Sequence, residues 1–208
     1  MLYSNTIERQ ENHYTMKKRT NVANIQVKQD MYKALLVLLE EKPISAVSVS
    51  DLSMKAQVSR MSFYRNYNSI EDILIEHMEE IVAEYESEDM GEWAAETERV
   101  YYGKAYMLHC FRFFYRHHEF IDTLLSCGMG DLFLVKITDY LIRKWVDTEW
   151  GTRADVLRIS AYAGAVYNMY REWKKNDFQE KPEDIALILH DMYAEPSDHC
   201  VRDGEHYE

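Results

Sequence analysis

Polar and cationic side chains are concentrated between Ser59 and Asn66, where the sequence reads SRMSFYRN. An arginine can hold guanine through two parallel hydrogen bonds, an asparagine can pair with adenine, and a methyl-bearing side chain can contact thymine. Serine and tyrosine hydroxyls can bond phosphate oxygens. This chemistry suits contacts with DNA, and the predicted contact residues are Ser59, Arg60, Met61, Ser62, Tyr64, Arg65 and Asn66. The alternative is a small solvated helix whose polar residues only confer solubility.

Serine residues mark helix starts around this segment. Ser48 is followed at the third place by Asp51, and Ser69 is followed in the same way by Asp72. A serine at a helix start accepts a hydrogen bond from a free backbone N–H, and an acid three residues later returns one. Ser59 is an N-cap candidate without such an acid. These signals predict helices over about 48–56, 59–67 and 69–87.

The first two of these helices are separated only by Gln57 and Val58, which predicts a helix-turn-helix. Leu52, Ala56 and Phe63 can share one small core. In this motif the second helix lies in the major groove, and the residues near its start reach base edges. We expect Ser48, at the start of the first helix, to contact DNA as well. The agreement of caps, tight turn and apolar set favours DNA binding over the solvated helix.

The charge distribution supports a DNA-facing first part of the chain. The net charge is −12, but residues 1–75 carry +2 and residues 76–208 carry −14. Basic residues 1–75 can face DNA phosphates, while acidic residues 76–208 are repelled by them. We expect residues 1–20 to form a flexible basic arm ending in Lys17, Lys18 and Arg19, which can follow the backbone or enter the minor groove. The predicted domains are a DNA-binding domain over 1–75 and a helical regulatory and dimerisation domain over 76–208.

The composition predicts an all-α fold of about nine helices. Only 7 Gly and 3 Pro occur in 208 residues, which favours long helices over tight turns. Apolar residues repeat at helical spacing, and beyond the head they predict helices over about 93–118, 120–127, 132–150, 154–175 and 182–193. A first helix is expected over about 21–41. No secretory signal or membrane span is expected, and three scattered cysteines suit a reducing cytoplasm.

The motif between Ser48 and Leu74 resembles that of the TetR/AcrR family of bacterial transcriptional regulators. The likeness rests on the short helix ending at Ala56, on Val58-Ser59, on Phe63-Tyr64 with Tyr67, and on the capped helix after Ser69. A weaker likeness extends from Tyr162 through Trp173 to Lys181-Pro182-Glu183-Asp184. The resemblance implies that Tyr64 and Asn66 face DNA, that Phe63 and Tyr67 are core, and that the chain is a homodimer on a palindromic operator. It also implies regulation, more commonly repression, by a small-molecule effector.

Two positions depart from the family pattern. The turn usually holds glycine where this chain has Gln57, and a non-glycine residue takes the left-handed conformation only at some cost. The helix after Ser69 usually begins with a phosphate-binding lysine, and Ile70 stands in its place. Loss of that contact would weaken DNA affinity without altering sequence preference.

Residues 76–208 offer candidates for an effector site and a dimer interface. Aromatic residues with a few polar groups can line an apolar pocket. The alternative for each of these residues is that it is simply buried in the hydrophobic core. The predicted ligand-binding residues are Tyr102, Tyr106, His109, Phe113, Phe114, Tyr140 and Tyr167. We expect the last two helices to pair across a two-fold axis, the alternative being burial within one chain. The predicted interface residues are Tyr162, Ala165, Tyr170, Trp173, Ile185, Leu189 and Met192.

Two other functions compete with this interpretation. One is an adapter that keeps the helix-turn-helix fold but acts through a protein partner, with weak, salt-sensitive DNA binding; Ile70 and the acidic body favour it. The other is an enzyme, for which His117-His118-Glu119 and His199-Cys200 are the only candidate clusters. Neither has the spacing of a HExxH metal site. We therefore expect no enzymatic activity, cofactor or metal.

Overall fold

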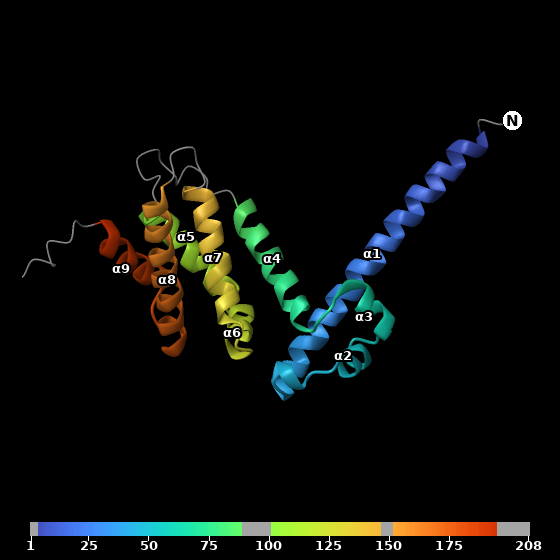
Figure 1. Ribbon diagram of the computed structural model, residues 1–208, viewed down its shortest axis with the longest axis horizontal. Helices are drawn as coiled ribbons and strands as arrows, with labels where there is room; N and C mark the ends of the chain where they lie inside the picture. The colour runs from blue at the N-terminus through green and yellow to red at the C-terminus, as the bar shows by residue number, and fades with distance from the viewer. Residues whose placement is uncertain (1–3, 89–100, 147–151, 195–208) are drawn as a thin grey trace, which may run out of the picture. The chain divides into compact units, whose positions relative to one another are not determined.

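The computed structural model describes residues 4–88, 101–146 and 152–194, with side chains of the first helix from residue 23 onward (Figure 1). Within these ranges the chain forms nine α-helices and one short 3-10 helix, in agreement with the all-α prediction. It divides into two compact units, one ending at Glu79 and the other beginning at Glu80.

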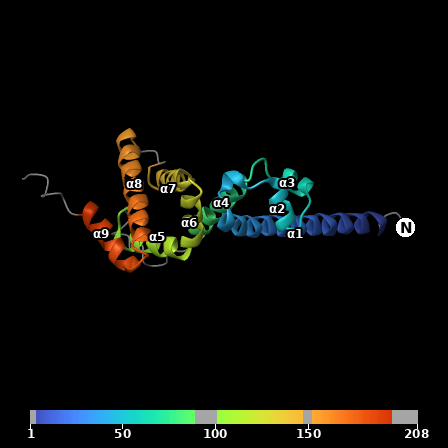
Figure 2. The same ribbon diagram turned by 90° about the horizontal axis from the view of Figure 1, so that it is seen from below.

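The first unit is built on a long helix. It contains α1 (Ser4–Glu41), the 3-10 helix η1 (Ile44–Ala46), α2 (Val49–Lys55), α3 (Arg60–Asn66) and the start of α4 (Glu71–Ser87). Both views show α2 and α3 beside α1 (Figures 1 and 2). The core is formed by fully buried side chains, among them Leu35 of α1, Leu52 of α2, Phe63 of α3 and Leu74 of α4.

All three predicted serine caps are present. Ser48 and Asp51 form a reciprocal capping box at the start of α2. Ser59 accepts a hydrogen bond from the backbone N–H of Ser62 over 3.0 Å. At the start of α4, the backbone N–H of Ser69 donates to the Asp72 carboxylate over 3.1 Å, and the backbone N–H of Asp72 donates to the Ser69 hydroxyl over 3.2 Å. Short helices leave many backbone groups without partners, so these caps determine where α2, α3 and α4 begin.

The start predicted for the first helix was wrong. It begins at Ser4 rather than near Asn21, so residues 4–20, which were expected to be an irregular arm, are helical. The physical reason is that no glycine or proline occurs between Ser4 and Glu41, and propagation of an existing helix costs little. The helix ends just before Pro43, as predicted.

The second unit contains the end of α4 and five further helices: α5 (Lys104–Arg116), α6 (His118–Ser126), α7 (Gly130–Trp145), α8 (Arg153–Lys175) and α9 (Pro182–Ala194). α5 packs on α9, and α7 packs on α8 and α6. Their common core includes the fully buried Phe111, Leu124 and Tyr170. Within the described residues, no helix combines the length and the apolar character needed to cross a membrane.

The fifth helix starts later than the apolar pattern predicted. Gly103 precedes α5 with φ −57° and ψ 136°, outside the helical region, so the helix starts at Lys104. The predicted start at Trp93 lies outside the described residues. The expected joint before α7 is present: Gly128 has a φ of +74°, which favours glycine. Gly130 begins α7 so close to Tyr167 that an added Cβ would lie 2.6 Å from its hydroxyl.

Candidate nucleic-acid interface

The core contacts of α3 decide which of its side chains point outward. Phe63 is fully buried and Tyr67, which follows the helix, is 6% exposed. Met61, Tyr64 and Arg65 are exposed and lie three and four residues apart, so they form one outward stripe. Met61 is 77% exposed and Tyr64 is 61% exposed. These three side chains are therefore available to a ligand as large as a DNA duplex.

The remaining predicted contact residues divide into three groups. Ser48, Ser59 and Arg60 are exposed, whereas Ser62 and Asn66 are only half-buried. Lys17, Lys18 and Arg19 lie in the part of α1 whose side chains are not described. The exposed members of the predicted set therefore lie on α3 and at the residues that precede α2 and α3.

Several polar side chains of this set are already hydrogen-bonded within the unit. The guanidinium of Arg60 donates to the Ser50 hydroxyl over 2.6 Å. The amide of Asn66 donates to the carbonyl of Ser62 over 2.8 Å. The hydroxyls of Ser59 and Ser62 lie 2.9 Å apart. Contact of Asn66 with adenine stays a prediction, and it requires the amide to give up its hydrogen bond to the Ser62 carbonyl.

The two departures from the family pattern have different structural consequences. Gln57, between α2 and α3, has a φ of 56° and so takes the left-handed conformation expected of this turn. Ile70 is 7% exposed and belongs to the core of the first unit. The position before α4 therefore contributes apolar burial instead of a positive charge.

Glu76 of α4 joins three elements of the first unit. Its carboxylate accepts a hydrogen bond from the Tyr67 hydroxyl over 2.5 Å and forms an ion pair with Lys28 of α1. Burial raises the pKa of Glu76, but the hydrogen bonds from Lys28 and Tyr67 and the charge of Lys28 outweigh it and leave the pKa below its ordinary value. This contact holds the end of α3 against α1 and α4. It was not predictable from sequence spacing, because it brings Lys28 of α1 to a carboxylate on α4.

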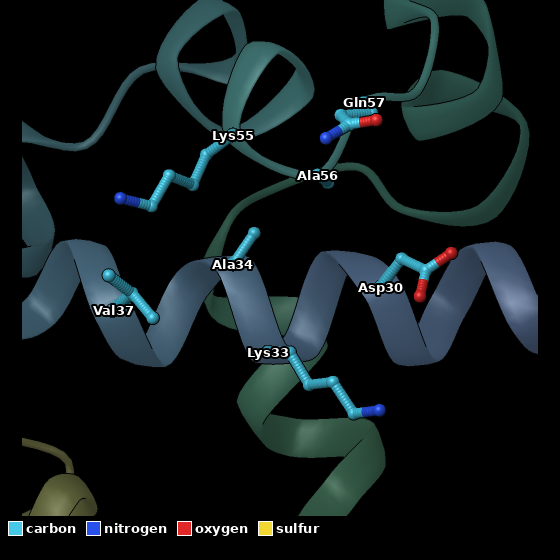
Figure 3. Close-up of a pocket in the computed structure, with 7 residues that line it drawn as sticks. All are labelled: Asp30, Lys33, Ala34, Val37, Lys55, Ala56 and Gln57. Atoms are coloured by element: carbon cyan, nitrogen blue, oxygen red, sulfur yellow. The ribbon is translucent and has the colours of Figure 1, made fainter.

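An open groove lies beside the turn between α2 and α3 (Figure 3). It runs along α1 and is lined by Asp30, Lys33, Ala34, Val37, Lys55, Ala56 and Gln57. Val37 is 38% exposed at its floor. The walls carry two lysines and one aspartate, so this face of the first unit combines positive charge with a small apolar area.

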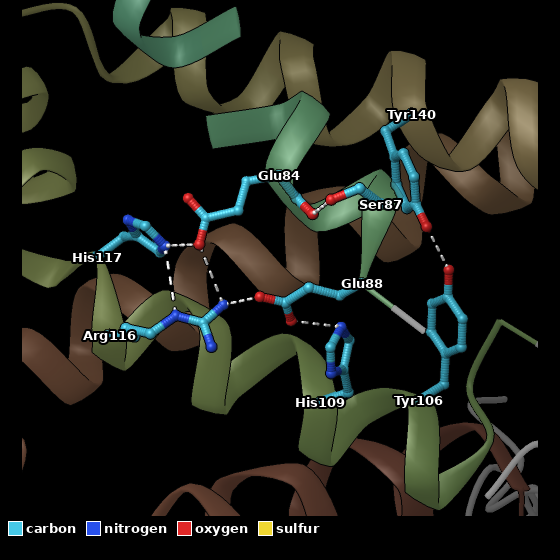
Figure 4. Close-up of polar contacts among 8 residues, drawn as sticks. All are labelled: Glu84, Ser87, Glu88, Tyr106, His109, Arg116, His117 and Tyr140. Atoms are coloured by element: carbon cyan, nitrogen blue, oxygen red, sulfur yellow. Dashed lines mark hydrogen bonds and ion pairs between the residues drawn. The ribbon is translucent and has the colours of Figure 1, made fainter. Parts of the chain in front are cut away.

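The predicted ligand-binding residues fall into three places in the second unit. Tyr106, His109, Phe113 and Tyr140 surround Tyr85 of α4, a residue that the sequence analysis missed. The hydroxyls of Tyr106 and Tyr140 lie 2.6 Å apart (Figure 4). Burial raises the pKa of Tyr85 and of Tyr106, so both hydroxyls remain protonated.

The other three predicted residues lie elsewhere. Phe114 and Tyr167 contact Phe133 of α7. Tyr102 packs on Tyr101, and its carbonyl lies 2.7 Å from His190 Nδ1. The predicted set therefore does not line one site.

Charged residues connect the end of α4 to α5 beside these tyrosines (Figure 4). Arg116 pairs with Glu84 over 3.5 Å and also with Glu88. His117 lies 3.2 Å from Glu84, and His109 Nε2 lies 3.4 Å from Glu88 but without hydrogen-bond geometry. Burial lowers the pKa of His109, although the charge of Glu88 opposes this shift.

The predicted dimer interface needs correction. Tyr162, Tyr170, Trp173, Ile185 and Leu189 are all less than 9% exposed within one chain. Trp173 packs edge-to-face against Phe111 and donates from its indole to the backbone carbonyl of Glu180, so it faces inward. An apolar stripe predicts burial but does not say whether the same chain or a partner provides it.

Only Ala165, which is half-buried, and Met192, which is 65% exposed, remain accessible from that set. The outward apolar residues of the last two helices are instead Leu157 of α8 and Leu187, Ile188 and Met192 of α9. They alternate with the inward set at helical spacing, which is the signal that could have identified them.

The histidine clusters considered for an enzyme do not come together with other metal ligands in the described residues. His117 faces Glu84, whereas His118 Nδ1 lies 2.7 Å from the carbonyl of Tyr115. His199 and Cys200 lie outside the described residues.

Comparisons with known proteins identify the same two parts of the chain. Residues 32–76 match the family described as "Bacterial regulatory proteins, tetR family", and residues 104–194 match the family "Transcriptional regulator C-terminal region". The first match contains α2 and α3 with their turn, and the second contains α5–α9. A comparison with curated proteins found no match.

Solved structures show a similar fold. A TetR transcriptional regulator from Streptococcus agalactiae 2603V has a TM-score of 0.58 and 21% identity, over 86% of this chain and 98% of that one. The dihydroxyacetone kinase operon activator DhaS has a TM-score of 0.52 and 18% identity, over 80% of this chain and 93% of that one. The helix-turn-helix geometry and the two family matches lead to one conclusion: the chain belongs to the TetR family of bacterial transcriptional regulators.

Proposed function

We propose that this regulator binds a palindromic DNA operator as a homodimer and that an effector bound in the second unit changes its DNA affinity. The observation that supports this most strongly is the outward stripe of α3, formed by Met61, Tyr64 and Arg65. The stripe lies on a helix capped by Ser59 and held by Phe63, so its side chains are positioned by the core. Rigid placement matters because base edges are recognised by geometry.

A homodimer follows from the geometry of DNA. One α3 helix reads only a few base pairs, and two copies related by a two-fold axis read half-sites about one helical turn, ~34 Å, apart. The outward apolar residues of α8 and α9, namely Leu157, Leu187, Ile188 and Met192, are the surface that we assign to this contact. They replace the buried residues predicted from the sequence.

We place the effector at the tyrosine and histidine cluster around Tyr85. The paired hydroxyls of Tyr106 and Tyr140 and the buried Nε2 of His109 are polar groups beside aromatic rings, and Glu88 adds a negative charge next to His109. Tyr85 and Glu84 lie on α4, which begins in the first unit and ends in the second, and Glu88 follows this helix directly. An effector that favours one position of α4 would change the spacing of the two α3 helices and hence DNA affinity.

We propose repression as the regulatory outcome, because a dimer on an operator excludes other proteins from that DNA. The structurally similar DhaS is named as an activator, so the sign should be measured directly. A reporter gene placed behind the selected operator would show lower expression with the regulator present. Higher expression would reverse the sign and leave DNA reading intact.

Selection from random duplexes tests the proposed function. Purified protein and the double variant Tyr64→Ala, Arg65→Ala would be incubated with a random duplex pool at near-physiological salt. Enrichment of a palindrome by the wild type alone is the expected result. A folded, dimeric wild type that enriches no sequence would contradict direct DNA reading.

A second candidate function is an adapter that acts through a protein partner. The burial of Ile70 favours it, because the phosphate contact that the family resemblance implies at this position is missing. The groove beside Gln57 offers a surface for such a partner. This alternative predicts DNA binding without sequence preference, which the same selection would reveal.

A further inference from the structure

Met61 stands out among the side chains on the proposed DNA-reading surface. It is the second residue of α3 and is 77% exposed, more than any other large apolar residue in the described parts of the chain. Residues near the start of this helix are the ones that reach base edges in a helix-turn-helix. In the proposed DNA complex, a large apolar side chain at this place would face the floor of the major groove.

The polar residues next to Met61 have hydrogen-bond partners in the free protein. Arg60 donates to Ser50, and Ser62 shares its hydroxyl contact with Ser59. Asn66 donates to the carbonyl of Ser62. Reading a base with any of them would require an existing hydrogen bond to break, which offsets part of the new one. Met61 has no such bond to lose.

We infer that Met61 is a specificity-determining residue that recognises the 5-methyl group of a thymine in each half-site. Thymine is the only base that presents a methyl group in the major groove, and apolar side chains distinguish it by contact. The flexible thioether chain of methionine adapts to such a surface, and burying it together with the methyl group removes apolar area from water. This inference rests on the proposed function and names the base feature that it reads.

The test replaces single thymines of the selected operator with deoxyuridine, which keeps base pairing but lacks the methyl group. Wild-type protein should lose about fourfold in affinity per half-site at one thymine position, the value expected for one buried methyl-sized group. Met61→Ala should bind the thymine duplex more weakly than wild type and be insensitive to deoxyuridine at that position. Met54→Ala is the matched control, because Met54 is 76% exposed on α2, and it should keep the wild-type sensitivity.

Three results would overturn the inference. Wild-type affinity could be unchanged by deoxyuridine at every thymine, or Met61→Ala could lose the same factor as wild type when deoxyuridine replaces thymine. In both cases sequence preference persists, so the proposed function stands while this role of Met61 fails. A folded dimer that selects no operator would overturn both together.

Discussion

The hydroxyl of Tyr67 donates a hydrogen bond to Oε2 of Glu76 over 2.5 Å, and the same carboxylate pairs with Lys28. Tyr67 immediately follows α3, so this contact fixes the end of the helix that carries the outward stripe. A change at Glu76 should therefore loosen the end of α3 without altering Met61, Tyr64 or Arg65, the side chains of its outward stripe.

Replacing Glu76 with alanine should destabilise the first unit by about 1.5 kcal/mol, the usual worth of a hydrogen bond to a charged group. Hydrogen exchange of the α3 amides would measure the effect, because none of the four tryptophans lies before residue 80 to report it by fluorescence. Glu40→Ala, at an exposed position of α1, is the control. Equal protection of α3 in both variants would contradict the account.

The same contact predicts a dependence on pH. The folded pKa of Glu76 lies below its ordinary value of 4.5, so its stabilisation is complete above that value and is lost as the pH falls through the folded pKa. Exchange of the α3 amides should therefore accelerate with acid more in the wild type than in Glu76→Ala, once intrinsic exchange rates are divided out. An identical acid response of the two proteins would contradict this role.

The local features of the first unit were predictable because each depends on a short stretch of sequence. The caps at Ser48, Ser59 and Ser69 and the tight turn at Gln57 each depend on residues within a few positions of one another. The start of α1 was not predictable from polarity, because a polar stretch without glycine or proline forms a helix or an arm equally well.

The second unit contains contacts that could not be predicted from sequence patterns. Helical spacing identified apolar faces on α8 and α9 but could not say which face the chain itself covers, so Tyr170 and Leu189 were assigned to an interface although both are fully buried. Tyr106, His109, Phe113 and Tyr140 were predicted as one set, but Tyr85 at their centre was not, because it comes from α4 while the others come from α5 and α7. Contacts between distant segments depend on packing, which periodicity does not encode.

Replacing Gln57 with glycine should stabilise the first unit by about 1 kcal/mol. Its φ of 56° carries a steric cost for any residue with a Cβ, and glycine removes this cost. Chemical denaturation followed by circular dichroism, together with exchange of α2 and α3 amides, would measure the change. Met54→Gly, inside α2, should instead destabilise by a similar amount. A loss of stability in Gln57→Gly would show that its side chain contributes more than its backbone costs.

An acidic residue in the outward face of α9 should produce monomers. Ile188 is 52% exposed, and Ile188→Asp would place a charge within the surface assigned to the homodimer. Sedimentation velocity should show the wild type as a dimer and this variant as a folded monomer that no longer binds the palindrome. Val135→Asp, at a 50% exposed position of α7, should remain dimeric. A dimeric Ile188→Asp would move the interface elsewhere.

The second unit should lose stability in mild acid through His109. Because burial lowers the folded pKa of His109 below its ordinary value of 6.5, the unfolded chain binds the proton first as the pH falls. Tryptophan fluorescence reports this unit alone, since all four tryptophans follow residue 80. Between pH 7.5 and 5.5 the urea midpoint should fall more for the wild type than for His109→Gln. Equal decreases would assign the acid sensitivity to other groups.

The most direct test of the central claim is a comparison of affinities for two duplexes at the same near-physiological salt concentration. One is the duplex enriched by the protein, and the other has the same composition with both half-sites scrambled. A sequence-reading dimer should bind the enriched duplex at least about 1,000-fold more tightly, the lower end for specific recognition, and Tyr64→Ala, Arg65→Ala should lose most of this ratio. A ratio near one for the folded, dimeric wild type would contradict the claim that α3 reads DNA.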